Sequence, residues 1–152
     1  MFDFTFRLFG SGWLEAELTG DGQELSIQAS HLSDAPADLL ISVNQLLNGR
    51  PEATCCWQEE PGAYQWVLTK EGRDVFIKLY WYDKSFPKYS DKAPVVFSGR
   101  DEMIRFARCI LRAFSTRALG VSASEYQKMW GYGYPEAELS RLRTLIKKSH
   151  QP

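Results

Sequence analysis

The sequence is poor in the residues that build most metal centres and many catalytic sites. Only His31 and His150 are histidines among its 152 residues, and only three residues are cysteines. Cys55 and Cys56 are adjacent, so they lack the two-residue gap of paired zinc thiolates, and on a strand they point to opposite faces. His31 could meet a cysteine in the folded chain, but a hydrogen-bonded histidine at a strand end is commoner. We therefore predict no metal, no cofactor and no catalytic residue.

Long apolar runs are also missing. No stretch approaches the roughly 20 apolar residues of a membrane span. The N-terminus has neither the basic start nor the apolar run of a signal peptide. An odd number of cysteines favours reduced thiols over a disulfide framework. From this and the length, we expect one globular domain over residues 1–152, located in the cytoplasm and without membrane contact.

Aromatic residues, in contrast, are abundant. Phe, Tyr and Trp make up 14% of the chain, which is more than a core of this size obviously needs. Buried rings dominate cores, and Tyr and Trp are also enriched at protein interfaces. We therefore expect some of these rings on a surface that contacts a partner.

The net charge of −1 hides an uneven distribution. Residues 1–60 carry ten acidic side chains against two arginines, whereas residues 61–152 carry sixteen basic side chains against nine acidic ones. In one interpretation the two halves face each other in the fold and neutralise each other. In the other, the molecule is dipolar and its acidic face steers a basic partner.

The first thirty residues alternate apolar and polar side chains with the period of a strand. Glycine-rich turns at residues 10–12 and 20–22 divide them into three strands. This pattern predicts an antiparallel meander with one buried face. Its inward positions are Phe2, Phe4, Phe6, Leu8, Leu14, Ala16, Leu18, Leu25, Ile27 and Ala29.

The rest of the chain alternates between helical and strand periods. A helix is expected from about Ser33 or Asp34 to residue 48, with Pro36 in its first turn. Strands are expected at about residues 53–60, 64–70, 74–83 and 93–98. Capping boxes at Ser98 and Ser122 predict a long helix to about residue 119 and a short one to about residue 130. A last helix ends near residue 148.

The predicted order is therefore three strands and a helix, then four strands and closing helices. The simplest fold with this order is α+β. It has a single antiparallel sheet of six or seven strands with the helices packed on one face.

Acidic side chains on the outer face of the predicted meander are the strongest candidates for a binding site. Any solvated sheet face carries charged side chains, and a surface that only has to be soluble carries both signs. The charged side chains of this face that we select are all acidic. We add two tyrosines of the predicted strand at 74–83, because this strand has large side chains on both of its faces. The candidate partner-binding residues are Asp3, Glu15, Glu17, Glu24, Tyr80 and Tyr82.

A second charged pattern lies on the predicted long helix. Arg105, Arg108 and Arg112 are three and four residues apart, so they share one face of the helix. A stripe that follows a nucleic-acid backbone has this spacing, and so does the solvated back of any amphipathic helix. The sequence pI of about 6.1 argues against a polyanionic partner.

Several short motifs resemble those of a family of small bacterial proteins. They are Gly12-Trp13, Ser30-His31-Leu32-Ser33-Asp34-Ala35-Pro36, Asp38-Leu39-Leu40, Glu60-Pro61-Gly62 with Trp66, and the segment from Phe106 to Trp130. Members of that family are similar to immunity proteins of contact-dependent or polymorphic toxin systems. The resemblance implies binding and blocking of a cognate toxin. The family usually has an aromatic residue at the position of His31, and no binding residue is transferred.

The leading hypothesis is a cytoplasmic immunity protein that binds a cognate protein toxin, such as a nuclease, and is not an enzyme. An alternative is a homo-oligomeric structural or regulatory domain whose aromatic residues meet across its own interface. A third is a nucleic-acid-binding protein that uses the arginine stripe.

Overall fold

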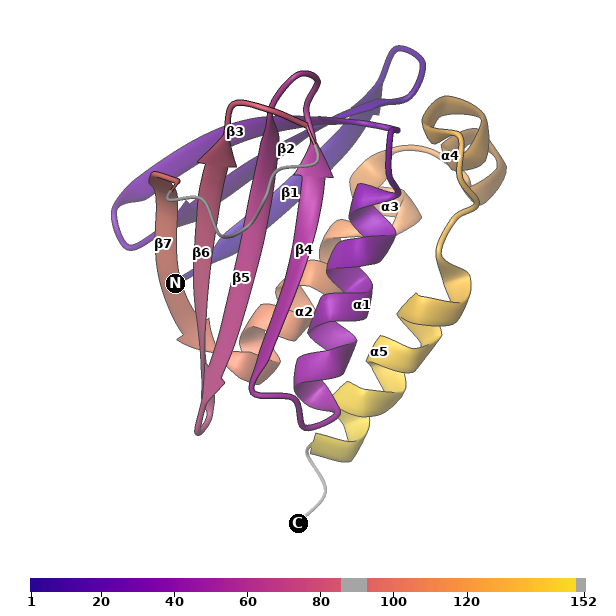
Figure 1. Ribbon diagram of the computed structural model, residues 1–152. Coiled ribbons are helices and arrows are strands. Elements are labelled where there is room, and N and C mark those ends of the chain that lie inside the picture. Colours follow the sequence, from indigo (N-terminus) through magenta and orange to yellow (C-terminus); the bar gives the residue numbers. More distant parts are fainter. Residues whose placement is uncertain (86–92, 150–152) are drawn as a thin grey trace.

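A computed structural model describes residues 1–85 and 93–149 of the chain (Figure 1). A first antiparallel sheet contains β1 (Asp3–Phe9), β2 (Trp13–Gly20) and β3 (Gln23–Ser30). A second contains β4 (Glu52–Gln58), β5 (Ala63–Glu71), β6 (Asp74–Tyr82) and β7 (Val95–Glu102). The helices are α1 (Ala35–Leu47), α2 (Met103–Ala113), α3 (Thr116–Leu119), α4 (Ala123–Trp130) and α5 (Glu136–Ser149).

The α+β class is confirmed, but the seven strands are divided between two sheets. Strand β3 does not continue into β7 through a backbone ladder. Instead the side-chain amide of Gln23 donates to the carbonyl of Ser98 at 2.7 Å and accepts from its N–H at 3.2 Å. An amide side chain offers the same donor and acceptor as a peptide group. The predicted single sheet is thus interrupted between β3 and β7, where the Gln23 side chain, and not a strand backbone, bonds to Ser98.

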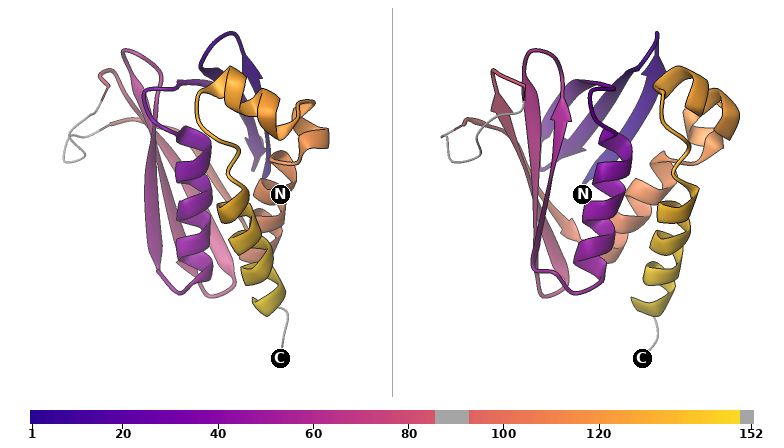
Figure 2. Two further views of the ribbon diagram at one scale, coloured as in Figure 1. Left: turned by 90° about the vertical axis from the view of Figure 1, so that its right-hand side faces the viewer. Right: turned by 45° about the vertical axis from the view of Figure 1, so that its right-hand side comes forward.

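The two sheets face each other through their inner, buried faces (Figure 2). They diverge towards one end, and the helices occupy the space between them. Phe4 of β1 meets the rings of Trp66 and Trp57, whose centroids lie 5.8 and 6.2 Å away. The period of two predicted from residues 2–8 is the buried pattern of β1. Most of the aromatic side chains that the structure describes are in the core, and the others, such as Phe9 and Trp13, are partly buried.

The helices lie on the inner side of the four-stranded sheet (Figure 2). Helix α1 packs on β4, α2 packs beside the edge strand β1, and α5 covers both helices from outside. Ser122 forms the predicted capping box with Glu125 and starts α4. The contact of α2 with β1 places this helix next to the three-stranded sheet.

The predicted start of the long helix at Ser98 is wrong. Residues from Ser98 to Glu102 continue β7, where Gly99 pairs with Ile77, and α2 begins only at Met103. The spacing of a capping box is a local signal, and here pairing with β6 outweighs it. The predicted helix also ends early, because Ser115 starts the separate helix α3 by accepting from the N–H of Ala118.

Candidate partner-binding surface

The four predicted acidic residues share the outer face of the three-stranded sheet. Asp3 pairs with Thr19 and Thr19 with Glu24, while Glu17 and Glu15 follow on β2. Because side chains alternate along a strand, this register places all four carboxylates on the side away from the core. We call Asp3, Glu15, Glu17 and Glu24 the acidic face. Asp3, Glu17 and Glu24 are exposed, and Glu15 is half-buried.

The carboxylates of the acidic face differ in how far they are engaged. Glu15 accepts from Arg7 at 2.7 Å across the strand pair and from the Ser26 hydroxyl at 3.3 Å. Within residues 1–85 and 93–149, neither Glu17 nor Glu24 forms an ion pair. In the same ranges Asp3 forms no ion pair either, but it accepts from the N–H of Phe4 at 3.0 Å and lies 3.5 Å from the Cys109 thiol. Glu17 and Glu24 are therefore the two side chains of the acidic face whose charge is open to a partner.

An aromatic pair closes one end of the acidic face, and the predicted site omitted it. The rings of Phe9 and Trp13 stack with centroids 6.5 Å apart, and the Arg7 guanidinium lies over Phe9 at 5.4 Å. Both rings are half-buried. The alternation that places Arg7 and Glu15 on the outer face also places Phe9 and Trp13 there. The sequence pattern could therefore have identified this pair, two residues away on each strand. Trp and Arg are among the residues that most often anchor protein interfaces.

The two predicted tyrosines do not join the acidic face. Tyr80 and Tyr82 lie on the outer face of the four-stranded sheet, opposite to the side on which Leu79 enters the core. Tyr82 is only 8% exposed and donates to Gln65 Oε1 at 3.2 Å, whereas Tyr80 is half-buried. Since the two sheets meet through their inner faces, their outer faces point away from each other.

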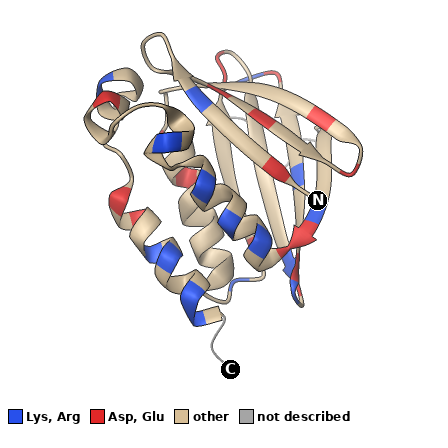
Figure 3. Cartoon of the chain, turned by 180° about the vertical axis from the view of Figure 1, so that it is seen from behind, with Lys and Arg blue, Asp and Glu red and all other residues tan. Residues whose placement is uncertain are grey.

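The arginine stripe lies beside the acidic face. Arg105, Arg108 and Arg112 are all exposed on α2, as the spacing predicted. In Figure 3 the Lys and Arg positions of α2 lie beside the three-stranded sheet, on which Asp and Glu positions are marked. This side of the molecule therefore carries both signs of charge in separate zones.

Ion pairs between described residues do not link the acidic half of the chain to the basic half. Each joins two residues of the same half. They are Arg7–Glu15, Arg100–Asp74, Arg105–Asp101 and Arg143–Glu136. This pattern favours the dipolar interpretation over mutual neutralisation.

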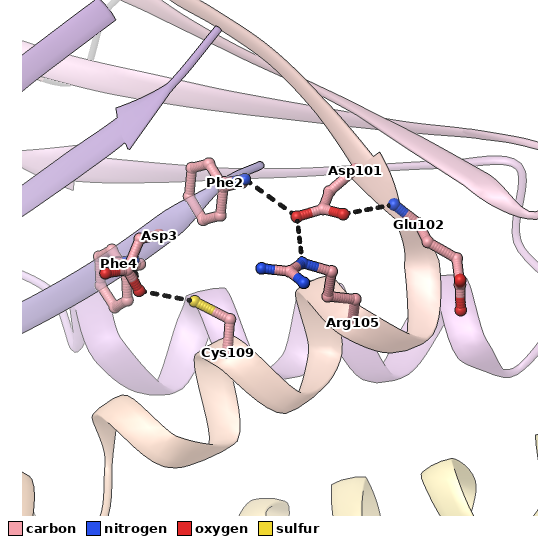
Figure 4. A network of polar contacts seen from close by, with 7 residues as sticks. All are labelled: Phe2, Asp3, Phe4, Asp101, Glu102, Arg105 and Cys109. Atoms are coloured by element: carbon pink, nitrogen blue, oxygen red, sulfur yellow. Dashed lines mark hydrogen bonds and ion pairs between the residues drawn. The ribbon is translucent and has the colours of Figure 1, made fainter. Parts of the chain in front are cut away.

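A polar network fixes the boundary between the two zones (Figure 4). The Asp101 carboxylate accepts from the N–H of Phe2 at 2.9 Å, from the N–H of Glu102 at 2.8 Å and from Arg105 Nε at 3.2 Å. The Cys109 thiol lies 3.5 Å from Asp3 Oδ1, within hydrogen-bond distance for sulfur. The network ties the start of β1 to the first turns of α2.

Two of the three thiols, those of Cys55 and Cys109, are poorly suited to nucleophilic chemistry. Burial is the main cause that raises the pKa of Cys109 to about 11, and the carboxylate of Asp3 adds to it. Burial likewise raises the pKa of Cys55 far above its usual range. A thiol with a raised pKa holds little reactive thiolate near neutral pH. His31 is exposed and packs against Gly12 and Gly131, and His150 lies outside the described residues.

In the part of the chain that the structure describes, no group of three or more His, Cys, Asp or Glu side chains is placed to hold a metal ion. No helix among the same residues has the length and apolar character needed to cross a membrane.

Comparisons with known proteins bear on the fold. No protein-family model matches the chain, and no curated protein matches it. Among solved structures, a chain of the CdiA-CT/CdiI toxin and immunity complex from Enterobacter cloacae is similar, with a TM-score of 0.50 and 10% identity. The match covers 74% of this chain and 98% of that one. At this identity the two chains share a fold, and no residue role transfers between them.

Proposed function

We propose that this protein is an immunity protein that blocks a cognate toxin domain by stoichiometric binding in the cytoplasm. The acidic face is the docking surface, and Phe9 and Trp13 are aromatic anchors at its end. The toxin presents a basic patch, as a nuclease active site does for its phosphate substrate. Binding of this kind needs surface complementarity and no reacting group in the immunity protein.

The open carboxylates of Glu17 and Glu24 on an exposed sheet are the observation that carries this proposal. Their charge attracts a basic partner over a distance of about 8 Å at physiological salt and raises the association rate. The similarity of the fold to a chain of a toxin and immunity complex supports the class of function. The motif resemblance points to the same class.

Co-expression with a candidate toxin domain, sought in the genes next to this one, tests the proposal. The wild-type protein should restore growth and bind a catalytically inactivated toxin domain as a one-to-one complex. A toxin that still kills cells in its presence, with no complex detected by titration calorimetry, would falsify the proposal.

Charge reversal of the open carboxylates locates the docking surface. Glu17→Lys combined with Glu24→Lys should weaken toxin binding at least tenfold and reduce its dependence on salt. Glu15 is left unchanged, because its reversal also breaks the ion pair with Arg7.

Glu52→Lys combined with Glu71→Lys is the matched control. It makes the same change of net charge at exposed positions of the other sheet. Equal weakening by both pairs would show that only the overall charge matters and that the acidic face is not the docking surface.

A further inference from the structure

A cleft opens between the start of β1 and α2, at the border of the acidic face. Its volume is about 270 Å³. It is lined by Met1, Phe2, Asp3, Arg105, Arg108, Cys109 and Arg112. The three arginines come from successive turns of one helix face, and Asp3 is the acidic residue of the lining.

Four residues of the network in Figure 4 also line this cleft, namely Phe2, Asp3, Arg105 and Cys109. The Asp101 carboxylate, 8% exposed, holds Arg105 at 3.2 Å and so sets the direction of its guanidinium. Phe2 and Cys109 are buried and contribute apolar surface. The raised pKa of Cys109, about 11, keeps its thiol neutral, so it adds no anion to the cleft. The lining therefore contains three cationic side chains and one acidic one, and Asp101 fixes the direction of Arg105.

We infer that the cleft receives a carboxylate side chain, Asp or Glu, of the same protein partner that docks on the acidic face. This inference rests on the proposed function and deepens it. A guanidinium presents a planar fork of donors that fits a carboxylate with two parallel hydrogen bonds. The volume suits one side chain.

Continuity of the surface assigns both zones to one partner. Asp3 belongs to the acidic face and also lines the cleft. A typical interface covers about 800 Å² on each partner, so a protein centred on a three-stranded sheet extends past its edge strand. Strand β1 is that edge, and α2 lies directly beside it.

The arginines of the cleft then contribute to the choice of partner. A uniformly basic protein is attracted by Glu17 and Glu24 but repelled by the stripe of Arg105, Arg108 and Arg112. The cognate partner avoids this repulsion by presenting an acidic side chain next to its basic patch. A nucleic acid matches the arginines but meets repulsion from Asp3 and the rest of the acidic face, which favours a protein occupant.

Charge reversal in the cleft tests this inference. Arg108→Glu combined with Arg112→Glu should weaken binding of the inactivated toxin domain at least tenfold. Lys147→Glu combined with Lys148→Glu makes the same change of net charge at the exposed end of α5 and should leave binding within about twofold. Circular dichroism and urea unfolding of each variant establish that it is folded.

A second pair of variants keeps the charge and traps the contact. Arg108→Lys combined with Arg112→Lys places amines in the cleft, and a carbodiimide joins such an amine to a carboxylate in direct contact. We expect a cross-link from position 108 or 112 to an Asp or Glu of the toxin domain, identified by mass spectrometry. A charge-reversed variant that binds like wild type, with no such cross-link, overturns the inference and leaves the proposed function standing.

The remaining outcomes are also decisive. If the wild-type protein does not bind the toxin domain, the proposed function fails and the inference fails with it. If single-stranded RNA or duplex DNA binds at low salt and the charge-reversed variant loses this binding, the cleft serves phosphates, and its assignment to a protein carboxylate is wrong.

Discussion

At the scale of single residues, Gly12 is a position where a side chain has no room. It has a φ of +78°, and a Cβ placed there lies 2.6 Å from atoms of the His31 ring. Gly10 in the same turn has a φ of +58° with open space around it. We expect Gly10→Ala to destabilise the fold by about 1 kcal/mol, the strain of the left-handed conformation. Gly12→Ala should cost a further ~1–3 kcal/mol.

A double-mutant cycle checks that the extra cost comes from the His31 ring. In the background of His31→Ala, the effect of Gly12→Ala should fall to that of Gly10→Ala, measured by urea unfolding. An effect of Gly12→Ala that is equal in both backgrounds would show that the two residues do not clash.

Asp38 gives a pH-dependent prediction. Burial first, and then repulsion by the carboxylate of Asp34, raise its pKa from 3.8 to about 6. A carboxyl group with a raised pKa binds its proton more tightly in the folded chain. Its contribution therefore weakens the fold as the pH rises from about 4 through about 6. Asp38→Asn should be more favourable relative to wild type at pH 7.5 than at pH 4 in urea unfolding. The same difference at both pH values would contradict this cause.

At the scale of elements, Asp101 joins the end of β7 to the start of both β1 and α2. Its side chain is 8% exposed, whereas that of its ion-pair partner Arg105 is 48% exposed. Asp101→Ala leaves the Phe2 N–H without its acceptor and should cost about 2–3 kcal/mol. Arg105→Ala removes an exposed ion pair and should cost about 0.5 kcal/mol or less.

The two variants are compared by urea unfolding and by amide exchange at Phe2. Faster exchange at Phe2 is expected in Asp101→Ala and not in Arg105→Ala. Similar losses of stability in both variants would mean that the ion pair, and not the backbone hydrogen bond, holds these elements together.

Local sequence signals predicted most elements because their causes are local. The meander of β1 to β3 follows from a period of two, and α4 follows from the capping box of Ser122 and Glu125. The start of α2 was missed because Ser98 and Gly99 pair with β6, about twenty residues earlier in the chain. The same local capping signal was therefore correct at Ser122 and wrong at Ser98.

At the scale of the whole molecule, the separation of acidic and basic side chains into two zones predicts how salt changes the rate of binding to the toxin domain. The association rate with the toxin domain should fall tenfold or more between about 20 mM and 500 mM salt, because screening removes long-range steering. The dissociation rate should change much less. Stopped-flow or surface-based kinetics measure both rates.

Glu17→Lys combined with Glu24→Lys should flatten this dependence, since it removes the open charges of the acidic face. A rate that does not respond to salt in the wild-type protein would exclude electrostatic steering as the role of the acidic face.

The sequence by itself determined the α+β class and the common face of Asp3, Glu15, Glu17 and Glu24, because a strand fixes the side of each residue by its period. Only the tertiary structure decided that there are two sheets and that Tyr80 and Tyr82 lie apart from the acidic face. It also placed the arginines of α2 beside β1. These features depend on contacts between distant residues, such as Phe2 with Asp101 and Gln23 with Ser98, and no local pattern encodes them.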